Sequence, residues 1–113
     1  MKVFIDEKRK PEEKYSDYDS WIHINNINEF VSFIDHLIKN NEWVEFVSFD
    51  YDSNRYHISL LCFEHLIKSC ILKDRQMPQI FLHSDDSSSE GVFKSIGSKY
   101  ERMTNNKVSI NII

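Results

Sequence analysis

The alternation of short apolar runs with helical patterns constrains the fold of this chain more than any other feature. Runs with strand character stand at residues 2–5, 21–24, 44–49, 80–82 and 107–113. Helical patterns follow the second, third and fourth runs, whereas residues 7–20 after the first are polar and predict a loop. Strands that alternate with helices form parallel sheets with right-handed crossovers. We therefore predict one α/β domain over residues 1–113, a three-layer α/β/α arrangement with a mostly parallel sheet of about five strands.

The helical patterns have recognisable starts. The first follows Asn26, and Glu29 completes a capping-box-like motif. Its apolar stripe has helical spacing and consists of Phe30, Phe33, Ile34, Leu37 and Ile38. The second pattern, roughly residues 57–73, is apolar around much of its circumference and predicts a buried helix. The third begins at another such motif, formed by Ser87 and Glu90.

Composition excludes several classes of protein. The formal net charge is −4, and an acidic chain is a poor sequence-independent binder of duplex DNA, because that binding needs clustered Lys and Arg. No apolar run is long enough to span a bilayer, and residues 1–9 lack the apolar stretch of a signal peptide. We therefore expect a cytoplasmic protein without a membrane partner. Cys62 and Cys70 fall about 12 Å apart along one predicted helix, too far for a disulfide, so we expect reduced thiols.

Acidic residues follow three of the predicted strands. The residues at these strand ends are Asp6 and Glu7, then Asp50 and Asp52, then His83, Ser84, Asp85 and Asp86. Ligands of open α/β sheets bind outside the carboxyl ends of the strands, where these side chains would meet. Crowded carboxylates repel one another unless a cation lies between them, and Mg²⁺ prefers oxygen ligands that it shares with a phosphate. The pattern therefore predicts a metal-assisted phosphoryl site.

Ordinary structural roles compete with this interpretation. Asp and Ser are common at strand-to-helix turns, where they cap helices and form local turns. His83 is either a general acid/base or a hydrogen-bonded turn residue. Ser84 either binds phosphate or caps the next helix. Arg9, in the loop after the first strand, either clamps a phosphate with its guanidinium or only solvates the loop.

Four segments resemble, in order, the motifs of the cyclic-phosphate processing receiver-like domain family. Residues 6–11, DEKRKP, resemble its D-D-x-R-x-P, and Trp21 with the following helix resembles its W-x-x-x-R-T segment. Residues 46–52, FVSFDYD, resemble its I-S-L-D-H-D, and residues 81–86, FLHSDD, resemble its F-x-H-S-x-N. The resemblance covers roughly residues 1–98, and its specificity comes from the order and spacing of the motifs.

The resemblance implies a receiver-like, flavodoxin-like fold and a role in processing 2′,3′-cyclic phosphate ends during RNA repair. On that basis we expect a metal-dependent phosphoesterase whose substrate is a nucleotide or an RNA end. The expected ligands of Mg²⁺ or Mn²⁺ are Asp6, Glu7, Asp50 and Asp52. The expected catalytic residues are His83, Asp50 and Ser84, and the expected phosphate-binding residues are Arg9 and Ser84.

Departures from the family motifs leave two alternatives open. They stand at Glu7, Asn25, Asn26, Tyr51 and Asp86, and the asparagines replace an Arg-Thr pair. The first alternative is a catalytically degenerate domain that binds a protein partner through Tyr15 and Tyr18. The bias toward residues with A/T-rich codons suggests a low-GC bacterium or its phage, so that partner would be a host protein. The second alternative is a phospho-acceptor receiver with Asp50 as acceptor, ranked last because the expected lysine after the last strand is absent.

Overall fold

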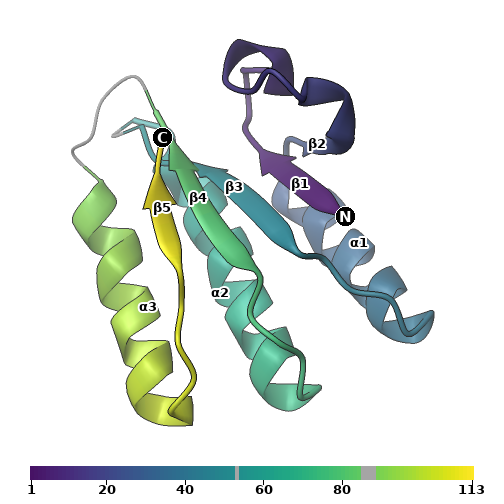
Figure 1. The fold of residues 1–113 in the computed structure, drawn as a ribbon, viewed down its shortest axis with the longest axis vertical. Coiled ribbons are helices and arrows are strands. Elements are labelled where there is room, and N and C mark those ends of the chain that lie inside the picture. The colour runs from purple at the N-terminus through teal and green to yellow at the C-terminus, as the bar shows by residue number, and fades with distance from the viewer. Residues whose placement is uncertain (53, 85–88) are drawn as a thin grey trace.

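The protein folds around one parallel sheet in a computed structural model that describes residues 1–52, 54–84 and 89–113 (Figure 1). The strands within these residues are β1 (Lys2–Ile5), β2 (Trp21–Ile24), β3 (Phe46–Asp50), β4 (Gln79–His83) and β5 (Ile110–Ile112). The helices are α1 (Ile27–Lys39), α2 (Tyr56–Leu72) and α3 (Glu90–Thr104), with two 3-10 helices, η1 (Pro11–Glu13) and η2 (Tyr18–Ser20). The strand order is β2-β1-β3-β4-β5, and all neighbours are parallel. The predicted α/β class and parallel receiver-like sheet are confirmed.

The two faces of the sheet are covered unequally. The connections through α1, α2 and α3 all advance in one direction across the sheet, so right-handed crossovers place the three helices on one face. Figure 1 shows α1 and α2 behind the strands. The connection from β1 to β2 runs in the opposite direction, and η1 and η2 belong to it. The third layer of the predicted α/β/α arrangement therefore consists of this small segment rather than of long helices. The predicted loop over residues 7–20 contains the two short 3-10 helices.

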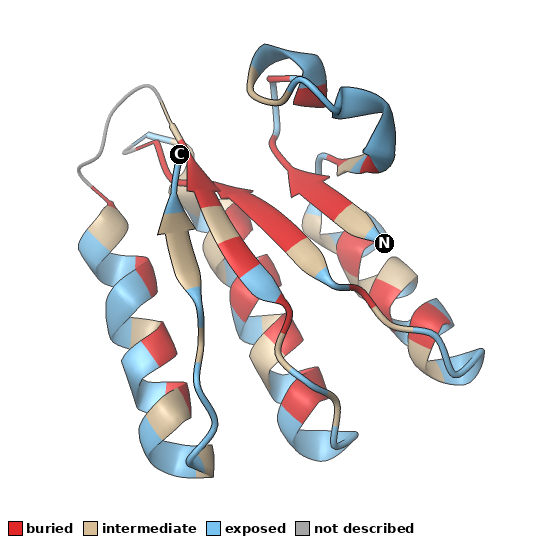
Figure 2. Cartoon of the chain, viewed as in Figure 1, coloured by how far each residue is buried: buried red, intermediate tan, exposed pale blue. Residues whose placement is uncertain are grey.

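The apolar core lies between the sheet and the three helices. Alternate residues of the central strands face it, because successive side chains of a strand point to opposite faces. Phe49 of β3, Phe63 of α2 and Phe93 of α3 form its aromatic centre, with ring centroids 5.4 to 6.0 Å apart. Figure 2 shows the buried residues along β1, β3 and β4 and on the sheet-facing sides of the helices. The whole apolar core therefore joins all three helices to the sheet.

Several local predictions can be checked against these elements. The Asn26 side chain caps α1 as predicted, because its Oδ1 accepts a hydrogen bond from the Glu29 amide over 2.8 Å. Cys62 and Cys70 are free and buried in α2, and burial raises the pKa of both thiols to about 12. The predicted cap at Ser87 lies outside the described residues. In the described part of the chain, no helix is long and apolar enough to cross a membrane.

Candidate functional site

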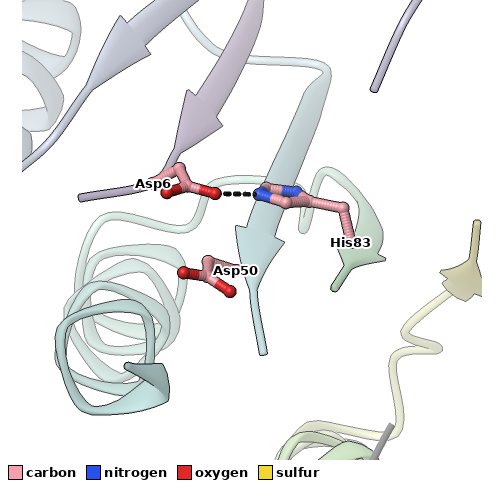
Figure 3. A group of neighbouring side chains, drawn as sticks. All are labelled: Asp6, Asp50 and His83. Carbon is pink, nitrogen blue, oxygen red and sulfur yellow. Dashed lines mark hydrogen bonds and ion pairs between the residues drawn. The ribbon is translucent and has the colours of Figure 1, made fainter. Parts of the chain in front are cut away.

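Three adjacent strands bring a histidine and two carboxylates together at their carboxyl ends. Asp6 follows β1, Asp50 is the last residue of β3, and His83 is the last residue of β4. One potential ligand atom from each residue lies within 4.8 Å of the others (Figure 3). All three residues are buried, with at most 1% of each exposed. We call this group the carboxylate–histidine centre.

Asp6 is held as a carboxylate by several hydrogen bonds. Its Oδ1 accepts from the backbone amides of Lys8 and Arg9, each over 2.8 Å, which turns the chain after β1 and brings Arg9 back over the site. Its Oδ2 accepts from His83 Nε2 over 2.9 Å and from Arg9 Nη1 over 3.0 Å. Burial alone would raise the pKa of Asp6, but the hydrogen bonds from His83 and the two amides outweigh it and hold the pKa well below its usual range.

His83 is a neutral imidazole with one defined tautomer. Burial lowers its pKa below the ordinary value, although Asp6 opposes this effect. The Asp6 carboxylate only accepts hydrogen bonds, so the single ring proton is on Nε2 and points to Asp6. Nδ1 therefore accepts from the Ser48 hydroxyl over 2.7 Å. The Ser48 oxygen in turn accepts from the Tyr15 hydroxyl, also over 2.7 Å.

This chain of hydrogen bonds runs along the sheet face opposite the helices. The Phe4 ring stacks on His83 with centroids 4.2 Å apart, and Tyr15 stacks on Trp21 at 4.3 Å. Ser48 and His83 are fully buried, whereas Tyr15 is half-buried on the η1–η2 side. The prediction that Tyr15 is exposed is therefore wrong, because its ring packs against Phe4 and Trp21. Tyr18 remains 44% exposed.

Asp50 and Asp52 form ion pairs with two arginines. Asp50 Oδ1 accepts from the Asp52 amide over 2.9 Å and from Arg9 Nη1 over 3.3 Å, and Asp50 Oδ2 accepts from Arg55 Nε over 3.2 Å. The Asp52 carboxylate accepts from both guanidiniums and from the Ser84 hydroxyl. Burial, together with the neighbouring carboxylates of Asp6 and Asp52, raises the pKa of Asp50 despite its hydrogen bonds. Two guanidiniums therefore offset three carboxylates beside a neutral imidazole.

Most of the residues predicted for the site meet there. Those that do are Asp6, Arg9, Asp50, Asp52, His83 and Ser84. Glu7 is exposed, and it belongs to no potential metal-binding group in the described part of the chain. Asp85 and Asp86 lie outside the described residues. Arg9 is buried against carboxylates, so its predicted contact with a phosphate would require it to change partners.

Three residues of this arrangement were not expected at the site from the sequence. Arg55 comes from the segment between β3 and α2, and its only signal was a cation close after Asp50 and Asp52. Ser48 had a clearer signal, because it is a polar residue inside the apolar run of β3, on the face opposite Val47 and Phe49. Tyr15 had no signal, since its position depends on how η1 and η2 fold over the sheet.

The donor set of the centre fits a divalent cation. Carboxylate oxygens of Asp6 and Asp50 are the ligands that Mg²⁺ prefers, and Mn²⁺ also binds carboxylates. His83 faces them with a protonated Nε2, so it takes the role of a hydrogen-bond donor rather than of a ligand. The oxygens of both carboxylates already accept hydrogen bonds from arginines, from amides or from His83. A cation bound between these carboxylates would therefore compete with the guanidiniums for their oxygens.

One comparison with known proteins confirms the resemblance. The profile of the family described as cyclic-phosphate processing receiver domain matches residues 1–94, which include the whole carboxylate–histidine centre. No curated protein and no solved structure gives a match. The family match covers most of the chain, and the strand order and the three strand-end residues fit a receiver-like domain. The protein therefore belongs to the cyclic-phosphate processing receiver domain family.

Proposed function

We propose that the protein is a metal-dependent phosphoesterase that opens 2′,3′-cyclic phosphates on nucleotides or at RNA ends. The observation that carries this proposal is the convergence of Asp6, Asp50 and His83 within 4.8 Å, in a chain of a family named for cyclic-phosphate processing. The position at the carboxyl ends of parallel strands also supports it, because substrates of α/β folds bind there.

The carboxylates have separate tasks in this proposal. Asp6 and Asp50 hold Mg²⁺ or Mn²⁺, and Asp52 orders their surroundings through Arg9, Arg55 and Ser84. A bound cation supplies positive charge that offsets the charge developing on the phosphate oxygens. Glu7 was predicted as a further ligand, but its exposed side chain makes it the weakest of the four candidates.

His83 is the proposed proton donor. Ring opening forms a bond between a water oxygen and phosphorus and breaks the bond from phosphorus to one ribose oxygen, which takes up a proton. The Nε2 proton of His83 points into the carboxylate–histidine centre, where it can be transferred to that oxygen. Nδ1 can gain a proton from Ser48 at the same time, and Tyr15 can resupply Ser48. The attacking water releases its proton to solvent, from which Tyr15 regains the proton that it gave, so the step is balanced. Ser84 and the arginines then contact the phosphate oxygens.

A hydrolysis assay tests the proposal. The substrates are a 2′,3′-cyclic nucleotide and an RNA that ends in a cyclic phosphate, each with Mg²⁺, with Mn²⁺ and with a chelator. We expect product only with a divalent cation, and a loss of at least about a hundredfold in Asp50→Asn and in His83→Ala. His36→Ala is the matched control, because His36 is exposed on α1. Equal product from wild type and both site variants would contradict the proposal, since the activity would then come from a contaminant.

A second candidate function is that of a protein-binding module. Its support is an apolar groove of about 430 Å³ between α2 and α3, whose apolar lining includes Ile67, Ile71, Ile96, Tyr100 and Met103. Met103 is 65% exposed. The closed arginine–carboxylate network is also compatible with a domain that does not turn over. Capture of a stoichiometric partner that is lost in Met103→Lys, from a protein without hydrolase activity, would favour this function.

A further inference from the structure

Two arginines reach the same carboxylates from different parts of the chain. Arg9 lies after β1 and pairs with Asp6, Asp50 and Asp52. Arg55 is the N-cap residue of α2, and it pairs with Asp50 through Nε and with Asp52 through Nη2. Both guanidiniums therefore take up carboxylate oxygens of the site that we propose for a divalent cation.

The two arginines differ in how firmly they are held. Only 7% of the Arg9 side chain is exposed, its guanidinium contacts three carboxylates, and its backbone amide is bonded to Asp6. The Arg55 side chain is 18% exposed and contacts two carboxylates. If one guanidinium leaves when a cation enters, Arg55 is therefore the better candidate, because it loses fewer contacts with carboxylates and is already more exposed to solvent.

A displaced guanidinium needs a new anion close by. A divalent cation and a guanidinium repel each other when they share a carboxylate, so cation binding pushes Arg55 away from Asp50. A phosphate bound to the same cation would be close to Asp50 and Asp52, the residues with which the Arg55 side chain already pairs. The planar guanidinium donates two parallel hydrogen bonds, which suits a phosphate as well as a carboxylate.

We propose that Arg55 changes partners during substrate binding: it neutralises Asp50 and Asp52 in the free protein and binds the substrate phosphate after a divalent cation has replaced it. This inference rests on the proposed function and assigns a phosphate-binding residue to it. Because Arg55 competes with the cation and assists the phosphate, the two ligands strengthen each other's binding. Linkage requires that this coupling be equal in both directions.

Calorimetry with Mn²⁺ and a nucleoside 3′-monophosphate tests the exchange without any turnover. Each ligand is titrated alone and in the presence of the other, into wild type, Arg55→Gln, Arg55→Lys and the surface control Arg102→Gln. In Arg55→Gln we expect tighter binding of Mn²⁺ alone and, in the presence of Mn²⁺, about tenfold weaker binding of the nucleotide, because charge-assisted bonds to the phosphate are lost. The mutual strengthening of the two ligands should disappear.

The lysine variant separates charge from geometry. Arg55→Lys keeps the positive charge, so Mn²⁺ alone should bind as in wild type, but the nucleotide should bind several-fold more weakly because lysine cannot donate the paired hydrogen bonds. This variant also keeps the inference testable if Arg55→Gln fails to fold. Arg102→Gln should match wild type in every titration.

Two results would overturn the inference, and they differ in what they leave standing. Unchanged nucleotide affinity and unchanged coupling in both Arg55 variants would make Arg55 a structural partner only, while a cation-dependent hydrolase would still stand. If wild type bound no Mn²⁺, either alone or with the nucleotide, the inference and the proposed function would both fail.

Discussion

The two faces of β3 carry different chemistry although their residues alternate along one strand. Val47 and Phe49 face the helices and are fully buried among apolar side chains. Ser48, between them, faces the other way, is equally buried, and is bonded to Tyr15 and His83. Burial therefore does not separate the faces; the kind of partner does. The contacts on the helical face are apolar and non-directional, whereas each buried hydrogen-bond acceptor on the opposite face needs a donor.

The largest effect should follow from a cavity on the helical face. Phe49→Ala removes a ring that packs on Phe63 and Phe93, and we expect a loss of about 3–5 kcal/mol in the free energy of unfolding. Such a loss is a large part of the total stability of a small domain, about 5–15 kcal/mol. Urea denaturation followed by circular dichroism measures it. Phe46→Ala, at a half-buried position of the same strand, is the control and should cost clearly less. Equal losses in both variants would remove the distinction between the faces.

A smaller effect is expected on the polar face. Ser48→Ala deletes the donor to His83 Nδ1 and the acceptor of the Tyr15 hydroxyl, and unsatisfied buried groups cost about 1–3 kcal/mol. The ring nitrogen signals of His83, measured by nitrogen-15 NMR, should also change, because nothing then holds the proton on Nε2 except Asp6. Phe49→Ala variants that remain folded serve as the comparison and should leave these signals in place. Unaltered His83 signals in Ser48→Ala would show that Asp6 alone sets the tautomer.

The fold and much of the site could be predicted from sequence because both depend on strand position. Parallel strands align their carboxyl ends, so residues after separate apolar runs, such as Asp6, Asp50 and His83, had to meet. Side-chain direction was harder to predict: Glu7 directly follows Asp6 yet stays exposed. The unequal layers depend on strand order, because β2 lies outside β1 and reverses the direction of the first connection. Arg55 depends on the path of the segment after β3, which periodicity does not describe.

The pH dependence of the stability that Tyr15 contributes tests how the η1–η2 segment covers the polar face of the sheet. Burial raises the pKa of its hydroxyl to about 12, with a smaller contribution in the same direction from Asp17 and an opposing one from the hydrogen bond with Ser48. The unfolded chain loses this proton near pH 10. The contribution of Tyr15 to stability is therefore complete below pH 10 and is lost as the pH rises from 10 toward 12.

Unfolding in urea at pH 9 to 12 measures this contribution, with ultraviolet titration of the tyrosines alongside. We expect Tyr15→Phe to be about 1 kcal/mol less stable at neutral pH, since it loses the bond to Ser48, and to lose less stability than wild type above pH 10. Tyr18→Phe is the control, because Tyr18 is exposed. If wild type and Tyr15→Phe lost stability equally above pH 10, the η1–η2 segment would not bury this hydroxyl in solution.

The smallest effect should come from the edge of the helical face, where α3 meets β5. Gly97 lies inside α3, and a Cβ there would stand 3.1 Å from the terminal methyl of Ile110 and 3.7 Å from a methyl of Val108. Alanine favours a helix interior over glycine by up to about 1 kcal/mol. The Ile110 side chain is half-buried on an edge strand, so its end can turn aside at small cost. We therefore expect Gly97→Ala to stabilise the protein by about 0.5 kcal/mol, measured as a higher urea midpoint. A lower midpoint would show that the Ile110 side chain cannot move aside. The contact between α3 and β5 would then be packed as tightly as the centre around Phe49.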